Sequence, residues 1–176
     1  DKNFESSDVA KRRILKLYRD DVSKFAKGYE HKVFALFDGI PAQLSKKEKK
    51  YTLSSISKDA RYRSYEDSFI WLHEAMIVNN CFNATDPNVG LALNEDRTYI
   101  KCYMGDTGLL VSHAFTEAEI ESEELYKQLI LGRLSINEGM IFENAVAQAL
   151  VSNGYVPYFY VHYNKDKHRN DIEIDF

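Results

Sequence analysis

The sequence predicts an α+β fold: a mainly helical, winged-helix-like domain with a β-hairpin wing, followed by the start of an α/β domain. Three observations predict it. Apolar residues recur at helical spacing through much of the N-terminal half. They alternate at strand spacing over 97–104 and again over 171–176. The 44% hydrophobic content of the 176 residues is enough for a real core.

Amphipathic spacing predicts three helices before residue 64. Gly28 ends the first, because glycine readily takes the left-handed conformation found after a helix. Pro41 begins a new turn after the second, since proline fits the first helical position. The three helices cover residues 6–27, residues 30–37 and a short stretch that ends near Arg63.

The strongest helical pattern covers Tyr65–Asn80, opened by Ser64 and Asp67 as a capping box. A β-hairpin is predicted next, with strands at 91–93 and 97–104. Helices followed by a hairpin wing are the order of a winged helix-turn-helix, whose long helix enters the major groove in DNA-binding members. Here the long helix carries no Arg or Lys. We therefore expect an interaction or scaffold role for it, not base readout.

Charge is divided unevenly along the chain. Residues 11–63 hold 15 Lys and Arg against 6 Asp and Glu, whereas residues 64–176 hold 7 against 18. The division suggests one face for a polyanion and another for a cation or a basic partner; two solvated surfaces that attract each other explain it equally well. Phosphate contacts to duplex DNA are expected from basic residues before the long helix, with a solvated loop as the alternative. These residues are Lys46, Lys47, Lys49, Lys50, Lys58, Arg61 and Arg63.

A short helix is predicted to begin at Asp106, in the run Asp-Thr-Gly-Leu-Leu, and to pack against the hairpin. Residues 116–134 open as an acidic connection and continue as a helix. We accordingly divide the chain into a helical domain at 1–115, an acidic connecting helix at 116–135 and the N-terminal part of a second domain at 136–176.

The C-terminal part predicts a helix over 137–153, closed by Gly154, and then two strands. Glu143 lies at the edge of the buried face of this helix, where a carboxylate is costly unless it has a partner. The last strand places Asp171, Glu173 and Asp175 on one face, because side chains alternate along a strand.

Glu143 and Asp175 are the candidate catalytic carboxylates, and Glu173 joins them as a candidate metal ligand. If the last strand lies beside the helix, these groups can share a Mg²⁺ ion. That ion prefers oxygen ligands and activates water at a scissile phosphate. A solvated acidic strand face is the alternative, with Glu143 acting as a cap or pairing with a lysine.

Other classes of protein find little support in the sequence. The five histidines, at positions 31, 73, 113, 162 and 168, show no ligand or triad spacing. Cys81 and Cys102 lack metal-ligand spacing, and we expect buried thiols in a reduced cytoplasm, not a disulfide. No apolar run is long enough to span a membrane, and no secretory signal is present. We expect a cytoplasmic location.

Blocks of sequence spread over nearly the whole chain occur in the order of a known family. The most specific begin at Asp106 (Asp-Thr-Gly-Leu-Leu), Glu143 (Glu-Asn) and Glu173 (Glu-Ile-Asp-Phe). Further blocks are Tyr18–Asp21, Ile40–Leu44 and Trp71-Leu72. In these blocks the chain resembles the C-terminal region, a domain of unknown function, of prokaryotic AAA-type ATPases.

The resemblance implies a P-loop ATPase domain upstream, then a winged-helix-like region and a restriction-endonuclease-like domain. Glu143 and Asp175 would take the first two acidic positions of the nuclease-like motif, with Glu173 a further acid. No Gly-x4-Gly-Lys-Ser/Thr motif occurs here, so ATP is expected only in the missing upstream domain. The Glu-x-Lys strand of such a site is expected beyond Phe176, which leaves the site incomplete.

Two functions are compatible with these observations. The first is a nucleic-acid-associated accessory module of such an ATPase, with an incomplete nuclease-like Mg²⁺ site. The second is a non-catalytic module that binds another protein or regulates it, in which the acidic C-terminal half recognises a basic partner.

Overall fold

The computed structural model describes residues 4–46, 50–88, 90–115, 138–164, 166 and 168–176. Its helices are α1 (Phe4–Phe25), α2 (Glu30–Leu44), α3 (Tyr62–Glu74), α4 (Thr107–Ala114) and α6 (Glu138–Ser152), with short 3₁₀ helices at Leu53–Ser55 and Leu91–Asn94. Its strands are β1 (Val78–Ala84), β2 (Glu95–Met104), β3 (Tyr158–Asn164) and β4 (Arg169–Ile174). The predicted α+β class is confirmed. The predicted connecting helix at 116–135 lies outside the described residues.

The four strands form one mixed sheet in the order β2-β1-β3-β4. Strands β1 and β2 are antiparallel, as are β3 and β4, whereas β1 and β3 run parallel. The parallel pair is extended by the Asn83 side chain, whose Oδ1 accepts a hydrogen bond from the Val161 backbone N–H at 3.1 Å. Segments from both sides of the predicted connection therefore share a single sheet.

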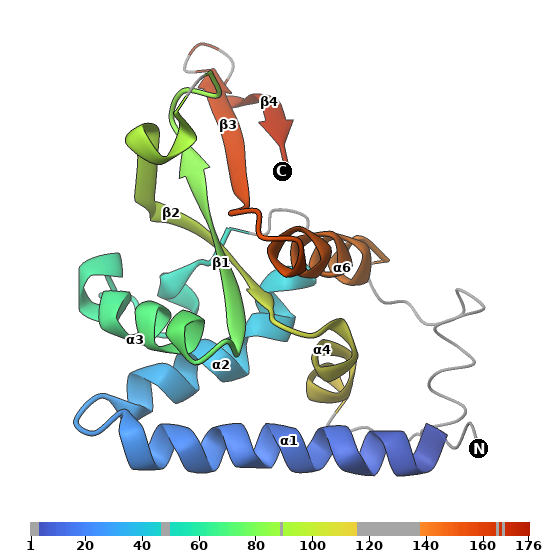
Figure 1. The fold of residues 1–176 in the computed structure, drawn as a ribbon. Helices are drawn as coiled ribbons and strands as arrows, with labels where there is room; N and C mark the ends of the chain where they lie inside the picture. Colours follow the sequence, from blue (N-terminus) through green and yellow to red (C-terminus); the bar gives the residue numbers. More distant parts are fainter. Residues whose placement is uncertain (1–3, 47–49, 89, 116–137, 165, 167) are drawn as a thin grey trace.

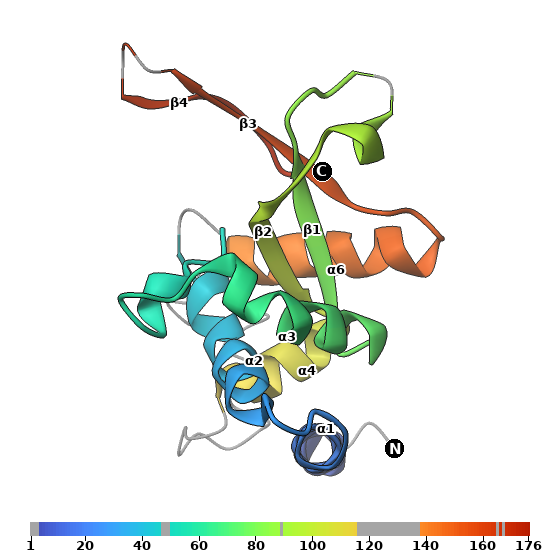
Figure 2. The same ribbon diagram turned by 90° about the vertical axis from the view of Figure 1, so that its left-hand side faces the viewer.

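The helices cover the two faces of the sheet unequally (Figure 1). Helix α6 packs on one face of β1 and β2, while α2 and α3 pack on the other. Helix α1 lies at the end of the molecule away from the β3–β4 hairpin and contacts α2 and α4 (Figure 1). The view in Figure 2 shows the hairpin projecting beyond this helical layer. None of the helices in the described ranges is both long enough and apolar enough to cross a membrane.

The two predicted glycine helix ends are confirmed. Gly28 follows α1 with φ 93°, and Gly154 follows α6 with φ 82°. At Gly154 two backbone hydrogen bonds close the helix: Gly154 N–H to the Val151 carbonyl at 2.9 Å and Tyr155 N–H to the Leu150 carbonyl at 3.0 Å. This pattern is a Schellman motif, which satisfies carbonyls that the helix itself leaves open.

Helix α2 does not stop at residue 37, as its Asp-Gly and Pro signals indicated, but continues through Pro41 to Leu44. Proline has no N–H, so the carbonyl four residues earlier, that of Phe37, loses its helical partner. The ring Nε2 of His113 in α4 donates to this carbonyl at 3.0 Å. A contact from another helix thus replaces the hydrogen bond that Pro41 removes.

The predicted helix at 65–80 is wrong at both ends. Helix α3 begins at Tyr62 and its N-cap is Arg61 without a side-chain hydrogen bond, so the expected capping box does not form. The helix ends at Glu74, and Met76 then takes a left-handed conformation with φ 57°. The last residues of the predicted helix belong instead to β1, whose asparagines are weak helix formers and which is buried on both faces.

The hairpin is also built differently from the prediction. Residues Leu91–Asn94 form a 3₁₀ helix, and the partner of β2 is β1, with a bulge between Phe82 and Asn83. The winged-helix assignment therefore lacks its expected long helix and first wing strand. A buried strand with three asparagines was not recognised, because its polar side chains hide the period on which strand prediction depends.

Asn144 docks α6 onto the sheet. Its side chain is fully buried and accepts from the Met104 N–H at 2.8 Å while donating to the Met104 carbonyl at 3.1 Å. It also donates to the Thr107 hydroxyl at 3.0 Å. One turn later, Gln148 Oε1 accepts from both the backbone N–H and the hydroxyl of Thr107, each at 2.8 Å. The side chains of α6 therefore satisfy the backbone where β2 turns into α4.

Replacing Asn144 with alanine should remove two buried hydrogen bonds and one partly buried hydrogen bond, and leave the Met104 backbone groups without these partners. We expect the free energy of unfolding to fall by roughly 2–4 kcal/mol, measured by urea denaturation. The control is Asn153→Ala, which removes one exposed local bond to the Ala149 carbonyl and should change stability by less than about 1 kcal/mol. Equal losses in the two variants would contradict the docking role of Asn144.

Candidate functional site

Lys101 in β2 is the centre of a cluster of charged side chains on the α6 side of the sheet. Only 2% of its side chain is exposed. Its Nζ lies 2.6 Å from Asp175 Oδ1 and 3.7 Å from Glu173 Oε1. It also stands 4.9 Å above the centroid of the Phe159 ring. The ammonium is therefore covered by the Phe159 ring and neutralised by the carboxylates of Glu173 and Asp175.

Glu143 reaches the same face of β2 two residues further along. Its Oε2 accepts a hydrogen bond at 3.0 Å from the hydroxyl of Tyr103, which is fully buried. The Tyr103 ring also packs against Phe176, with centroids 5.6 Å apart. Because side chains two apart on a strand share a face, Tyr103 and Lys101 point the same way.

The structure thus brings the three predicted carboxylates to one side of the sheet. Asp175 and Glu173 contact Lys101, and Glu143 contacts Tyr103. The carboxylates of Glu173 in β4 and of Asp175 just after it are partly open to solvent, with 38% and 48% of their side chains exposed. The resulting cluster is a row of acidic groups above a buried cation.

Burial controls the acid–base behaviour of the groups beneath this row. It raises the pKa of the Cys81 thiol to about 12, even though the charge of Lys101 acts in the opposite direction. It also raises the pKa of the Tyr103 phenol, and the neighbouring Glu143 carboxylate adds to that rise. Both groups are therefore protonated at neutral pH, and neither serves there as a base. The two cysteines are buried and unpaired, as predicted.

The cluster meets only one requirement of a Mg²⁺ site. Carboxylate oxygens are the right donor chemistry. However, an ion held by both Asp175 and Glu173 would stand close to the Lys101 ammonium and be repelled by it. Within the described ranges, no three His, Cys, Asp or Glu side chains are grouped as metal ligands. The residues as they lie fit an ammonium and not a divalent ion, and the magnesium site stays a prediction from the sequence.

The predicted nucleic-acid-binding residues are spread over several environments. Lys46 donates to Gln43 Oε1 at 2.9 Å, and Lys50 lies 3.7 Å above the Tyr99 ring. Lys58 and Arg61 are exposed in the segment before α3, and Arg63 is exposed in its first turn. Lys47 and Lys49 fall outside the residues that the structure describes. Three of the exposed cations, Lys58, Arg61 and Arg63, therefore lie at the start of α3, whereas Lys46 is exposed just after α2.

Lys101 was missed as a member of the site. Its face of β2 is covered by α6 and by residues of the C-terminal segment, among them Phe159 and Asp175. A signal was present in the sequence: a lysine within an otherwise apolar strand needs an acidic partner, and an acidic strand ends the chain. Sequence spacing alone does not link two residues 74 positions apart.

Comparison with protein families gives one match. The domain of unknown function DUF8612 matches residues 1–120. The chain belongs to this family. The matched residues include α1 to α4 and the first two strands, and thus Lys101 and Tyr103, but not Glu143 or the C-terminal hairpin. No curated protein and no solved structure matches the chain significantly.

Lys101 is buried and Asp175 is partly exposed, so loss of the Asp175 charge should destabilise the fold mainly through the lysine that it leaves behind. We expect Asp175→Asn to lower the free energy of unfolding by about 1–2 kcal/mol, since it leaves a buried ammonium with a weaker partner. In a Lys101→Met background, Asp175→Asn should leave the free energy of unfolding nearly unchanged. A double-mutant cycle should therefore give a coupling energy between the two positions. Asp67→Asn, an exposed carboxylate on α3, is the control and should cost less than about 0.5 kcal/mol. Additive effects in the cycle would contradict the pairing.

Stability should fall at alkaline pH. In the folded chain the pKa of Cys81 is raised to about 12, whereas in the unfolded chain the thiol ionises with an ordinary pKa of about 8.5. Between these values the unfolded state holds fewer protons, so raising the pH favours unfolding by about 1.4 kcal/mol per pH unit for this group. Urea denaturation at several pH values should show a smaller slope in Cys81→Ala. An unchanged slope would exclude this contribution.

Proposed function

We propose that this chain is a nucleic-acid-associated accessory module of a longer AAA-type ATPase, with a nuclease-like site that is incomplete. The observation that carries the proposal is the cluster around Lys101. The helix carboxylate Glu143, the strand carboxylate Glu173 and Asp175, which directly follows that strand, lie on one side of the sheet together with a buried lysine. Helix and strand carboxylates with a lysine are the groups that nuclease-like sites use. Here the lysine comes from β2.

The contacts among the motif blocks support the proposed kinship. The block at Asp106 caps α4 and bonds to Gln148 of α6, near the Glu143-Asn144 block. Asn144 in turn bonds to Met104, next to the tyrosine that contacts Glu143 and Phe176. The blocks that begin at Asp106, Glu143 and Glu173 are far apart in the sequence, but residues of each lie near the C-terminal end of β2.

The proposed module does not cleave phosphodiesters on its own. Lys101 neutralises the Glu173 and Asp175 carboxylates, which would otherwise attract a divalent cation. No step of the proposal depends on a metal ion. The role of the cluster within this chain is to hold the C-terminal hairpin against β2.

Association with nucleic acid is proposed to occur at the start of α3. Lys58, Arg61 and Arg63 are exposed there, and Lys32 of α2 lies close by, donating to the Ser64 carbonyl at 2.8 Å. Exposed cations of this kind contact phosphates and carry no sequence information. The remainder of α3 offers Glu66, Asp67 and Glu74, so base readout by this helix is not proposed.

A second candidate function is a non-catalytic module that binds protein. The observation that favours it is the outer surface of α1, where four large apolar side chains are exposed, among them Leu17 at 51% and Phe25 at 58%. The others are Val9 and Ile14. Exposed apolar groups gathered on one helix are more typical of a protein interface than of a nucleic-acid interface.

Duplex DNA binding distinguishes the two functions. We expect the chain to bind a fluorescent duplex at low salt, with affinity that falls steeply as salt rises. The double variant Arg61→Glu with Arg63→Glu should weaken binding and reduce the slope of log K against log salt by about 1–2. The control is Arg13→Glu with Lys16→Glu, which changes the charge equally on α1.

Two outcomes would contradict the nucleic-acid function. One is the absence of binding at low salt, which would favour the protein-binding module. The other is equal weakening in both double variants, which would indicate a general effect of net charge. Incubation of supercoiled plasmid with the chain and Mg²⁺ should leave the plasmid intact. Nicking that is lost in Asp175→Asn would overturn the proposal that the site is incomplete.

A further inference from the structure

One side of α1 is packed against the rest of the fold. Leu15 and Val22 are buried in the core. The buried Asp8 carboxylate accepts a hydrogen bond from the Ser112 hydroxyl of α4 at 3.0 Å. Helix α1 contacts α2 and α4, and Figure 2, in which α1 is seen end-on, shows these helices on one side of it. The opposite side of α1, its outer side, faces away from them.

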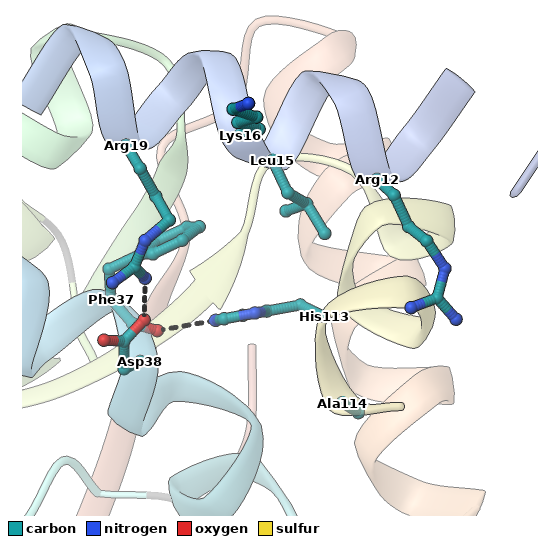
Figure 3. Close-up of a pocket in the computed structure, with 8 residues that line it drawn as sticks. All are labelled: Arg12, Leu15, Lys16, Arg19, Phe37, Asp38, His113 and Ala114. Carbon is teal, nitrogen blue, oxygen red and sulfur yellow. Dashed lines mark hydrogen bonds and ion pairs between the residues drawn. The ribbon is translucent and has the colours of Figure 1, made fainter. Parts of the chain in front are cut away.

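The cations on the inner side of α1 are largely engaged within the chain. A cavity of about 620 Å³ lies there between α1, α2 and α4, and Arg12, Lys16 and Arg19 border it. Arg12 forms an ion pair with Asp8 at 2.6 Å. Figure 3 shows Arg19 reaching Asp38 of α2, with which it forms a second ion pair. Both arginines are therefore neutralised by carboxylates of the same chain.

The outer side of α1 carries a row of exposed residues. Ala10, Ile14, Leu17 and Asp21 follow one another at spacings of four, three and four residues, and all are exposed. This spacing places side chains in line along one side of a helix, as in the seam of a coiled coil. The exposed fraction is 38% for Ile14 and 51% for Leu17. The middle of the row is therefore an apolar strip open to solvent.

Two opposite charges lie along one edge of this row. Arg13 and Asp20 are seven residues apart, two helical turns, and so lie on the same side of the helix. Both are exposed, and within the described ranges neither side chain takes part in a hydrogen bond or ion pair. The edge is positive toward the start of α1 and negative toward its end. It is therefore complementary to its own reversed copy.

An antiparallel copy of α1 would match both features at once. With a two-fold axis between positions 15 and 16, Ile14 lies opposite Leu17 of the second copy, and Arg13 lies near Asp20 of the second copy. The axis produces each contact twice. A parallel copy would instead place Arg13 beside Arg13 and Asp20 beside Asp20, and like charges at such positions repel. The charges of α1 thus favour one orientation.

We propose that the outer side of α1 binds a second copy of this chain, as an antiparallel pair of α1 helices related by a two-fold axis. The proposal names the partner of the second candidate function, the protein-binding module, and rests on that function. Each copy contributes one side of one helix, and Asp21 ends the apolar part of the row. Such an interface is at the small end of specific interfaces, so the dimer is weak and forms reversibly with concentration.

Sedimentation equilibrium of the whole chain, from roughly 1 to 300 μM, should show a mass that rises from monomer toward dimer. Arg13→Glu and Asp20→Arg should each weaken the dimer at least about fivefold, because each turns two attractions into two repulsions. The double variant Arg13→Glu with Asp20→Arg should return to within about twofold of the original affinity, since the pairs form again with reversed signs. The control Lys58→Glu makes the same charge change before α3 and should alter the affinity less than about twofold.

Disulfide cross-linking tests the orientation. Chains with Ala10→Cys and chains with Asp21→Cys should form a cross-linked dimer when mixed, because the two positions lie opposite each other. Neither chain should cross-link with itself, since equal positions are offset by eleven residues, or about 16 Å along the helix, and a disulfide spans about 7 Å at most between Cα atoms. Cys81 and Cys102 are buried and should not compete.

The proposal is overturned if the chain stays monomeric over this range, if the control weakens the dimer as much as Arg13→Glu, or if the charge swap fails to restore it. Self-linking of each cysteine chain without mixed dimers would overturn the antiparallel orientation. A monomeric chain would leave binding of a different protein at α1 untouched. Titrations with DNA at chain concentrations below the dimer range measure the nucleic-acid function separately.

Discussion

The buried ammonium of Lys101 is the constraint on which the C-terminal part of the molecule depends. A lysine that is 2% exposed is costly unless a carboxylate meets it. Glu173 belongs to β4 and Asp175 directly follows the last residue of that strand, and their spacing of two residues fixes which face of this segment turns toward β2. A shift of one residue in the β3–β4 pairing would carry Asp175 and Glu173 to the other face and leave the ammonium alone. The charge therefore selects the register as well as the position of the hairpin.

Helix α6 completes this arrangement with hydrogen bonds and not with apolar packing alone. Asn144 bonds to the backbone of Met104 as a neighbouring strand would, and Gln148 bonds to Thr107. These bonds place Glu143 where it accepts from Tyr103, two residues from Lys101. Hydrogen bonds of buried amide groups require narrow ranges of distance and angle. They therefore fix both the rotation of α6 about its axis and its distance from the sheet. Candidate ligand and candidate catalytic groups are thus held by the same bonds that stabilise the fold.

Several features could be predicted because they depend on local chemistry. Gly28 and Gly154 end helices through their left-handed backbone, and Asp106 caps α4 by accepting from the Leu109 N–H at 2.7 Å. Glu173 and Asp175 both contact Lys101, as their spacing of two residues allows, whereas the register of β4 is interrupted at Asp171. Other predictions were wrong where a distant contact outweighed a local signal. Helix α2 passes through Pro41 because His113 bonds to the carbonyl that proline leaves open. No feature of the sequence indicated the cavity between α1, α2 and α4, because the cations that border it resemble the solvated side of an ordinary helix.

The sequence by itself determined the α+β class and the helix ends marked by glycine. It also singled out Glu143, Glu173 and Asp175 as the candidate carboxylates of a nuclease-like site. These follow from backbone preferences and from side-chain periods, which act over a few residues. Only the tertiary structure decided that β1 is a strand, that β3 joins it in one sheet, and that Lys101 neutralises Asp175. Such choices depend on which buried polar groups find partners across long stretches of chain, and that pairing has no counterpart in local spacing.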